Sequence, residues 1–392
     1  MKFIHTSDWH IGKTLKGRDR SAEQQAVLAE IIAHARAQEV DAILVAGDLY
    51  DTAAPNAEAQ RLVVSALMQL RETGAEVIAI AGNHDHAPTF EAYRPLMEAA
   101  GITLVGQPRP AEQGGVVAFT ARSSGEPVRV VVMPFISQRH AVNAAELVAH
   151  TPSENAASYD QQVRDIVSAL SEEFADDAVN LVMAHLTVIG GMFGGGERTA
   201  QSIFEYSVPA AIFGTTPHYV ALGHLHRRQE LAAGCPVHYC GSPYAIDFGE
   251  QDNVNVICLV EASPGVPAKV TDLEITSALK LRTVAGSVDE LRERSDDLQE
   301  GFLRVWVREA ARAGLREDVA AILPNALEVR IDPDFLPVQD QTTAPRADGR
   351  RSPHELFDDY LATQGIDDER VQKLFRRLHD DAASTRHDGL NP

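Results

Sequence analysis

Residues 42–52 read AILVAGDLYDT, so five apolar residues run directly into a glycine and a pair of aspartates. An uninterrupted apolar run of this length that ends at glycine is typical of a strand buried on both faces. In layered α/β domains, ligands bind where such strands end and loops begin. Asp48 and Asp51 therefore stand where the sheet of an α/β domain would place a functional site.

Similar apolar, β-branched runs recur over residues 1–276 and alternate with stretches of helical spacing. The alternation predicts an α/β layered domain, and the strand-rich later part favours a second sheet packed on the first. The predicted strands are Lys2–Thr6, Ala42–Ala46, Val77–Ala81, Val128–Met133, Leu181–Ala184, Tyr219–Leu222, Val237–Cys240, Val254–Val260 and Lys269–Ile275. The predicted helices lie around Ala22–Gln38, Ala57–Arg71 and Gln161–Phe174.

Residues 277–335 predict a small separate α+β unit, because helical and strand patterns restart there over a short length. Its helices are expected at Val288–Leu298 and Leu315–Ile322, and its strands at Phe302–Val307 and Ala326–Ile331.

The end of the chain has a different character. Residues 336–353 are rich in Pro, Thr, Asp, Gly and Arg and predict a linker. Residues 354–380 predict two short amphipathic helices, and residues 381–392 a disordered tail. A helix pair too short to fold alone either docks on its own domain or binds a partner, and the residues alone favour neither.

The formal net charge of −21 opposes broad electrostatic attraction to a polyanion. A protein of this charge that acts on DNA needs bound cations or a partner subunit to help hold it. The three cysteines, Cys235, Cys240 and Cys258, lack metal-type spacing and predict reduced thiols in a cytoplasm. The first residues lack the features of a signal peptide, and no apolar run approaches the roughly 20 residues that cross a membrane.

Short polar motifs follow five of the predicted strands. Each motif alone is a weak signal, since a lone Asp-x-His or His-x-His is more often an ordinary polar loop than a metal site. Together they would gather carboxylates, an amide oxygen and imidazoles in one cleft. The motifs are Asp8-Trp9-His10, Gly47-Asp48-Leu49-Tyr50-Asp51, Gly82-Asn83-His84-Asp85, His185 and Gly223-His224-Leu225-His226.

This mixture of hard oxygen ligands and imidazoles suits Mn²⁺, Fe or Zn²⁺, and no cysteine lies among the motifs. Asp48 is the natural bridge, since one carboxylate offers an oxygen to each of two ions about 3.5–4 Å apart. We assign the first metal to Asp8, His10, Asp48 and His226, and the second to Asp48, Asn83, His185 and His224. An extended backbone would send His224 and His226 to opposite faces, so a loop or bulge is expected there.

His84 is the candidate general acid, because its side chain should point away from that of the neighbouring ligand Asn83. Asp51 is the candidate to orient its imidazole, with Asp85 as the runner-up. For both aspartates the alternative is a structural role in which the carboxylate bonds local backbone amides, and that alternative is stronger for Asp85.

At these motifs the chain resembles the calcineurin-like metallophosphoesterases and, within them, the SbcD family of bacterial nucleases. The similarity to the SbcD family lies in residues 4–12 (IHTSDWHIG) and 45–52 (VAGDLYDT). It continues in residues 196–198 (GER) and 352–357 (SPHELF), so the likeness spans nearly the whole chain. The glycine-rich segment Gly190–Gly196 corresponds to a loop that borders the DNA path in this family, although a plain surface loop is an equal alternative.

The resemblance implies a four-layer α/β–β/α sandwich with a capping domain over residues 277–335. It also implies a manganese-dependent nuclease that degrades duplex DNA from 3′ to 5′ and cuts single strands and hairpins. The implied assembly is a homodimer within a heterotetramer, in which residues 354–380 bind the SMC-like ATPase SbcC, and Glu197 and Arg198 are candidate DNA contacts.

The chain departs from the SbcD pattern at two positions, and three other functions are alternatives to a nuclease. His86 stands where the family often has serine; it is either an extra ligand or a solvent-facing turn residue, and we favour the turn residue. Gly196 stands where the family often has serine before Glu-Arg. A phosphoprotein phosphatase would carry Arg and Glu at the positions of Thr52 and Asp85. A phosphodiesterase for small nucleotides would have little use for a cap and a tethered helix pair, and a non-catalytic scaffold would not need His84.

Overall fold

The computed structural model describes residues 1–137, 152–197 and 207–335, and beyond them only Phe357, Asp358, Leu361, Val371 and Lys373–Phe375. The chain divides into two compact units, Met1–Leu336 and Pro337–Pro392. The predicted linker (336–353), most of the predicted helix pair (354–380) and the predicted tail (381–392) thus lie outside the described residues. Within the second unit, the rings of Phe357 and Phe375 stack with centroids 3.9 Å apart.

The first sheet has six strands in the order β14-β13-β1-β2-β3-β4. Its parallel part consists of β1 (Lys2–Thr6), β2 (Ala42–Val45), β3 (Glu76–Ile80) and β4 (Ile102–Val105). The other two strands, β13 (Val256–Ser263) and β14 (Val266–Glu274), are antiparallel, and β13 pairs with β1. The carboxyl ends of the four parallel strands therefore share one edge.

The second sheet also has six strands, in the order β11-β12-β10-β7-β6-β5. Four of them run parallel: β6 (Pro127–Met133), β7 (Val179–His185), β10 (Tyr219–Gly223) and β12 (Val237–Tyr239). The antiparallel edges are β5 (Val116–Thr120) and β11 (Gln229–Leu231). A two-stranded sheet pairs β8 (Thr187–Val188) with β9 (Ser207–Val208).

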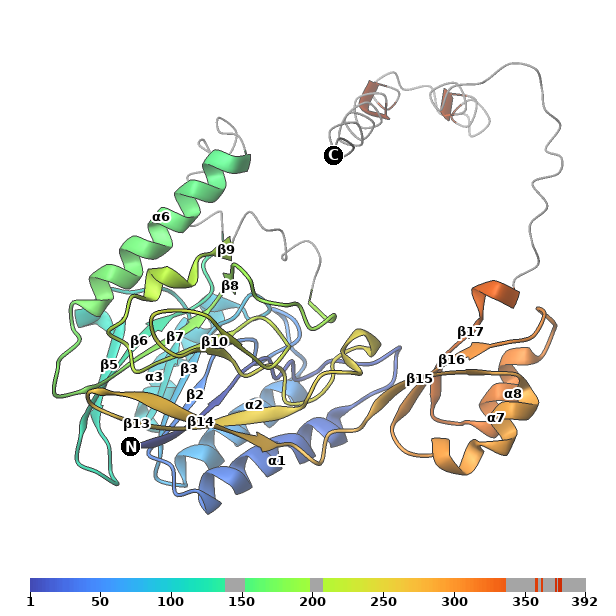
Figure 1. The fold of residues 1–392 in the computed structure, drawn as a ribbon, viewed down its shortest axis with the longest axis horizontal. Helices are drawn as coiled ribbons and strands as arrows, with labels where there is room; N and C mark the ends of the chain where they lie inside the picture. The colour runs from blue at the N-terminus through green and yellow to red at the C-terminus, as the bar shows by residue number, and fades with distance from the viewer. Residues whose placement is uncertain are drawn as a thin grey trace. The chain divides into compact units, whose positions relative to one another are not determined.

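Successive side chains of a strand point to opposite faces of the sheet, so each large sheet packs against helices on one face and against the other sheet on the opposite face. The result is four layers. In β2, Ile43 and Val45 pack with the helices on the outer side of the first sheet, whereas Ala42 and Leu44 face the second sheet. The outer helices of the first sheet are α1 (Ser21–Ala37), α2 (Ala57–Arg71) and α3 (Ala87–Ala99), and that of the second is α6 (Pro152–Ser171). Figure 1 shows α1 and α2 on one side of the sheets and α6 on the other. The predicted α/β sandwich is confirmed.

Residues 281–331 form a smaller sheet, in the order β15-β16-β17, with its own apolar core. Its strands are β15 (Leu281–Gly286), β16 (Phe302–Val307) and β17 (Ala326–Ile331), and its helices are α7 (Val288–Glu293) and α8 (Leu315–Ile322). Leu281 and Phe302 also pack against Leu15 and Phe248 of the larger domain. This unit has the mixture of helices and strands predicted for residues 277–335, and its assignment as a capping domain with a boundary at residue 277 stays a prediction.

The connection into this small unit is tied to α1 by one carboxylate. Glu30 accepts hydrogen bonds from the backbone and hydroxyl groups of both Thr276 and Ser277, at 2.6–3.0 Å. Burial opposes ionisation of Glu30, but these four donors outweigh it and lower its pKa to about 2.

The predicted strands and helices match the structure closely, and α2, β16, α8 and β17 have the predicted bounds. The prediction missed α3, β4, β5, β8, β9, β11 and β15. It also expected one helix over Val288–Leu298, whereas α7 ends at Glu293 and a 3-10 helix spans Ser295–Leu298. It also grouped the late strands into the second sheet, whereas β13 and β14 extend the first. The reason is non-local pairing, since Lys2 lies opposite Glu261. None of the helices in the described part of the chain is long and apolar enough to cross a membrane.

Candidate metal centre

The polar motifs gather where strands of both large sheets end. Asp8 and His10 follow β1, Asp48 follows β2 and Asn83 follows β3 in the first sheet. From the second sheet, His185 is the last residue of β7, and His224 and His226 come after β10. The structure thus brings all seven predicted metal ligands to one place.

The backbone turns sharply at several of these residues. Asp8, His10, Asp48 and His224 have φ values of 52°, 43°, 52° and 103°, in the left-handed region that non-glycine residues rarely adopt. Such conformations cost free energy and cluster at functional sites. The turn at His224 re-aims the His-Leu-His segment as the sequence required. Gly47 shows how tight the centre is, since a Cβ there would lie 2.2 Å from Nδ1 of His185.

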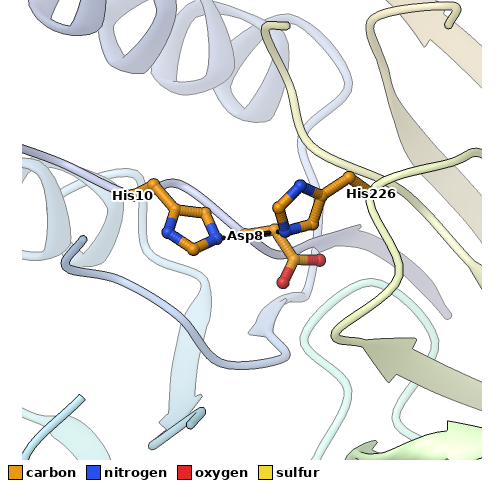
Figure 2. Close-up of side chains that lie close together, drawn as sticks. All are labelled: Asp8, His10 and His226. Atoms are coloured by element: carbon orange, nitrogen blue, oxygen red, sulfur yellow. Dashed lines mark hydrogen bonds between the residues drawn. The ribbon is translucent and has the colours of Figure 1, made fainter. Parts of the chain in front are cut away.

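Asp8, His10 and His226 form the first cluster, and their potential ligand atoms all lie within 4.8 Å of one another. Figure 2 shows the imidazoles of His10 and His226 facing each other, joined by the dashed line that marks their contact, with Asp8 beside them. The Nε2 atoms of His10 and His226 are 3.2 Å apart. Two ring nitrogens aimed at each other beside a buried carboxylate form a donor set that a divalent cation would satisfy.

Asp48, His185 and His224 form the second cluster. Asn83 belongs to it, because its Oδ1 lies 2.9 Å from His185 Nε2 and 2.7 Å from His224 Nδ1. Asp48 connects the two clusters through a single oxygen. Its Oδ2 is 3.6 Å from His10 Nε2 and 3.4 Å from His185 Nε2.

The electrostatics of the centre divide its four imidazoles into two pairs. Although burial opposes it, Asp48 raises the pKa of His185 to about 9 and Glu250 raises that of His226 to about 10, so a metal would displace a proton from each of these two rings. Burial and then the neighbouring imidazoles lower the pKa of His10 to about 4, although Asp51 and Asp48 oppose this, and burial lowers that of His224 to about 3. These rings are therefore neutral at pH 7, which is the form that ligates metals. Burial raises the pKa of Asp8 to about 6, and Asp48 adds to this effect. For Asp48, burial is outweighed by His185 and His10, which hold its pKa well below the usual range.

His84 lies at the edge of both clusters. Its ring is 4.5 Å from that of His10, and its backbone N–H donates to Asp48 Oδ1 at 2.7 Å. Its Nδ1 donates to the backbone carbonyl oxygen of Asp51 at 2.7 Å. Asp51 was predicted to orient this imidazole, and the hydrogen bond described here comes from its main chain. The Asp51 carboxylate lies 3.2 Å from Lys13 Nζ and 3.6 Å from His10 Nδ1.

Asp85 has a structural role, which was the alternative to orienting His84. Its carboxylate accepts backbone N–H bonds from Gly82, Leu49 and Tyr50, at 2.9, 3.2 and 3.0 Å. It therefore joins the loop that carries Asp48 to the loop that carries Asn83 and His84. We call these three bonds the Asp85 clamp.

The outcome differs among the remaining predicted residues. Glu197 lies beside His226, with its carboxylate bonded to backbone amides, and its DNA contact stays a prediction. Arg198 lies outside the described residues. His86 is exposed and pairs with Thr89 Oγ1 at 2.8 Å before α3, in agreement with a turn residue. No sequence motif surrounds Glu250, so it was not among the predicted site residues, although its Oε1 lies 2.6 Å from His226 Nδ1.

Comparisons with known proteins agree with this geometry. A family model described as calcineurin-like phosphoesterase matches residues 1–228. The SbcD subunit of the nuclease SbcCD from Bacillus subtilis is 34% identical over 285 residues, which cover 72% of this chain and 71% of that protein. The protein of the same name from Escherichia coli K12 is 30% identical, with 74% and 72% covered. The one from Rhodobacter capsulatus is 32% identical, with 68% and 67% covered.

Proposed function

The chain belongs to the calcineurin-like phosphoesterases, and from this premise we propose that it is a metal-dependent DNA nuclease, the nuclease subunit of an SbcCD complex. The observation that carries the proposal is the position of Asp48 Oδ2 between His10 and His185. One carboxylate oxygen between two imidazole clusters is what a centre for two neighbouring ions requires.

We infer that each ion would have four protein ligands. When bound, the two ions would stabilise the negative charge that develops on a phosphoryl group and lower the pKa of a water molecule toward neutrality. The ligand sets are Asp8, His10, Asp48 and His226 for one ion, and Asp48, Asn83, His185 and His224 for the other.

His84 supplies the proton in the proposed reaction. A carbonyl oxygen only accepts hydrogen bonds, so the contact with Asp51 O keeps a proton on Nδ1 of His84. Nε2 is then the ring atom that gains or loses a proton, and it delivers that proton to the sugar oxygen that leaves when the P–O bond breaks. The bond from His84 N to Asp48 Oδ1 fixes this imidazole relative to both clusters.

The finer assignments rest on the resemblance. We propose manganese as the working metal, degradation of duplex DNA from 3′ to 5′, and cutting of single strands and hairpins. We further propose a homodimer that binds an SbcC-type ATPase through residues 354–380, in the cytoplasm and on the nucleoid when bound to DNA. The net charge of −21 supports a partner that contributes DNA-binding surface, and the exposed apolar side chains of Val371 and Leu374 support a docking role for the helices.

Digestion of DNA tests this function. Purified protein is incubated with end-labelled duplex DNA in Mn²⁺, Mg²⁺ or EDTA, beside a phosphomonoester. Shortening of the DNA that requires Mn²⁺, with little monoester hydrolysis, is the expected result. Intact DNA together with turnover of a cyclic nucleotide or another small phosphodiester would replace the proposal with a small-nucleotide phosphodiesterase.

A further inference from the structure

Glu250 holds the ring of His226 from the side opposite the metal centre. It ends the short 3-10 helix Phe248–Glu250 and is 1% exposed. Its Oε1 lies 2.6 Å from Nδ1 of His226, and its Oε2 accepts the backbone N–H of Ile246 at 2.8 Å. Because an ionised carboxylate only accepts, the proton of this bond sits on Nδ1. Nε2, which faces His10 at 3.2 Å, is then the ring atom available to a metal.

Glu197 holds the backbone of the same histidine. Its Oε1 accepts the N–H of His226 at 3.0 Å and that of Gly194 at 2.6 Å. Its Oε2 accepts the N–H of Gly195 at 2.8 Å. One carboxylate thus ties the glycine-rich segment Gly190–Gly196 to the loop that carries His226.

The glycines of this segment permit the close packing. A Cβ on Gly196 would lie 1.9 Å from Glu250 Oε1, and a Cβ on Gly194 would lie 2.9 Å from His226 Cβ. Any side chain at Gly196 would therefore displace the carboxylate that holds the ring. The segment is a support for His226 as well as a candidate border of the DNA path.

We propose that Glu250 is a positioning residue that orients His226 through Nδ1, that Glu197 fixes its backbone, and that this pair sets the metal affinity of the first cluster. The inference rests on the proposed function, because it assumes that the first cluster binds a metal. Carboxylates that accept the second ring N–H of a ligating histidine fix its orientation and raise its basicity, and their removal usually costs 10- to 100-fold in metal affinity. The second cluster contains neither His226 nor a contact with Glu250 among the hydrogen bonds described here.

Mn²⁺ titration of three proteins tests the inference without any measurement of cleavage. In calorimetry, the parent should bind two ions, and Glu250→Gln should weaken one of the two binding events by about 10- to 100-fold while the other is unchanged. Glu230→Gln is the matched control, since the Glu230 side chain is 68% exposed on β11. Two unchanged binding events in Glu250→Gln would overturn the inference and leave the proposed function intact. No binding by the parent would overturn both.

A spectroscopic measurement on the parent protein covers the case in which Glu250→Gln does not fold. In the diamagnetic Zn²⁺ form, ¹⁵N-histidine spectra should show the ring proton of His226 on Nδ1, shifted downfield by the short bond to Glu250. A His226 proton on Nε2 in that form would contradict the inference. Glu197→Gln should leave the proton on Nδ1, because Glu250 holds the ring, and should weaken the same Mn²⁺ binding event. An unaffected event would contradict the role of Glu197.

Discussion

Asp85→Asn should destabilise the protein through the Asp85 clamp. In the parent, Oδ2 accepts the N–H groups of Gly82 and Leu49, and Oδ1 accepts that of Tyr50. Asparagine has a single acceptor oxygen. If it keeps the two bonds of Oδ2, its NH₂ group faces the N–H of Tyr50, so one bond is lost and two donors oppose each other.

The expected cost is about 2–4 kcal/mol. A hydrogen bond to a charged acceptor contributes about 1.5–3 kcal/mol, a buried N–H left without a partner costs about 1–3 kcal/mol, and the two bonds that remain become weaker. An opposing effect reduces the sum: burial and the nearby Asp48 carboxylate raise the pKa of Asp85 to about 7, so loss of the charge relieves some repulsion.

Thermal unfolding in EDTA measures this cost without the contribution of bound metal. The unit Met1–Leu336 has an unfolding entropy of about 0.7 kcal/mol/K, so a loss of about 2–4 kcal/mol predicts a fall in Tm of roughly 3–6 °C. Asp289→Asn is the matched control, because the Asp289 side chain is 87% exposed and pairs only at the surface with Arg292. It should shift Tm by less than about 1 °C. A similarly small shift for Asp85→Asn would refute the clamp.

Three further predictions concern His84, residues 353–392 and Glu30. His84→Gln should keep metal and DNA binding but slow cleavage by about 10²–10⁴-fold, and loss of bound Mn²⁺ in that variant would contradict its role as the acid. Deletion of residues 353–392 should abolish co-purification with an SbcC-type ATPase and spare Mn²⁺-dependent cutting of short DNA; retained co-purification would contradict the docking role. Glu30→Gln should cost about 1–3 kcal/mol at pH 7, since its amide opposes donors from Thr276 and Ser277. The folded pKa of Glu30 is lowered to about 2, so its contribution is full above about pH 4.5 and fades as the pH falls toward 2; the Tm difference from the parent should narrow between pH 7 and pH 3.5, and a constant difference would contradict this.

The local part of the fold was predictable because buried strands leave continuous apolar runs. The run at residues 42–46 and its counterparts located most strands of both sheets, and the polar residues just after them located the centre. Pairing between distant strands leaves no such signal. Nothing in Val256–Ser263 indicates that it lies beside Lys2–Thr6, so its sheet could not be assigned from the sequence.

The same limit applies within the site. Asp51 was expected to orient His84, and its backbone carbonyl oxygen accepts the hydrogen bond from His84 Nδ1, a main-chain contact that a sequence motif does not reveal. Glu250 was missed because it reaches His226 through a tertiary contact across 24 residues. The predicted ligands were identified by residue type and spacing, whereas the residues that support them become visible through packing.

The central claim, that one centre holds two ions through a shared Asp48, is tested most directly by counting bound Mn²⁺ in the parent and in Asp48→Asn. We predict two ions per parent chain, and loss or marked weakening of both binding events in the variant, since Asp48 Oδ2 lies near His10 and His185 at once. Fewer than two ions in the parent, or two equally tight ions in Asp48→Asn, would contradict the shared ligand.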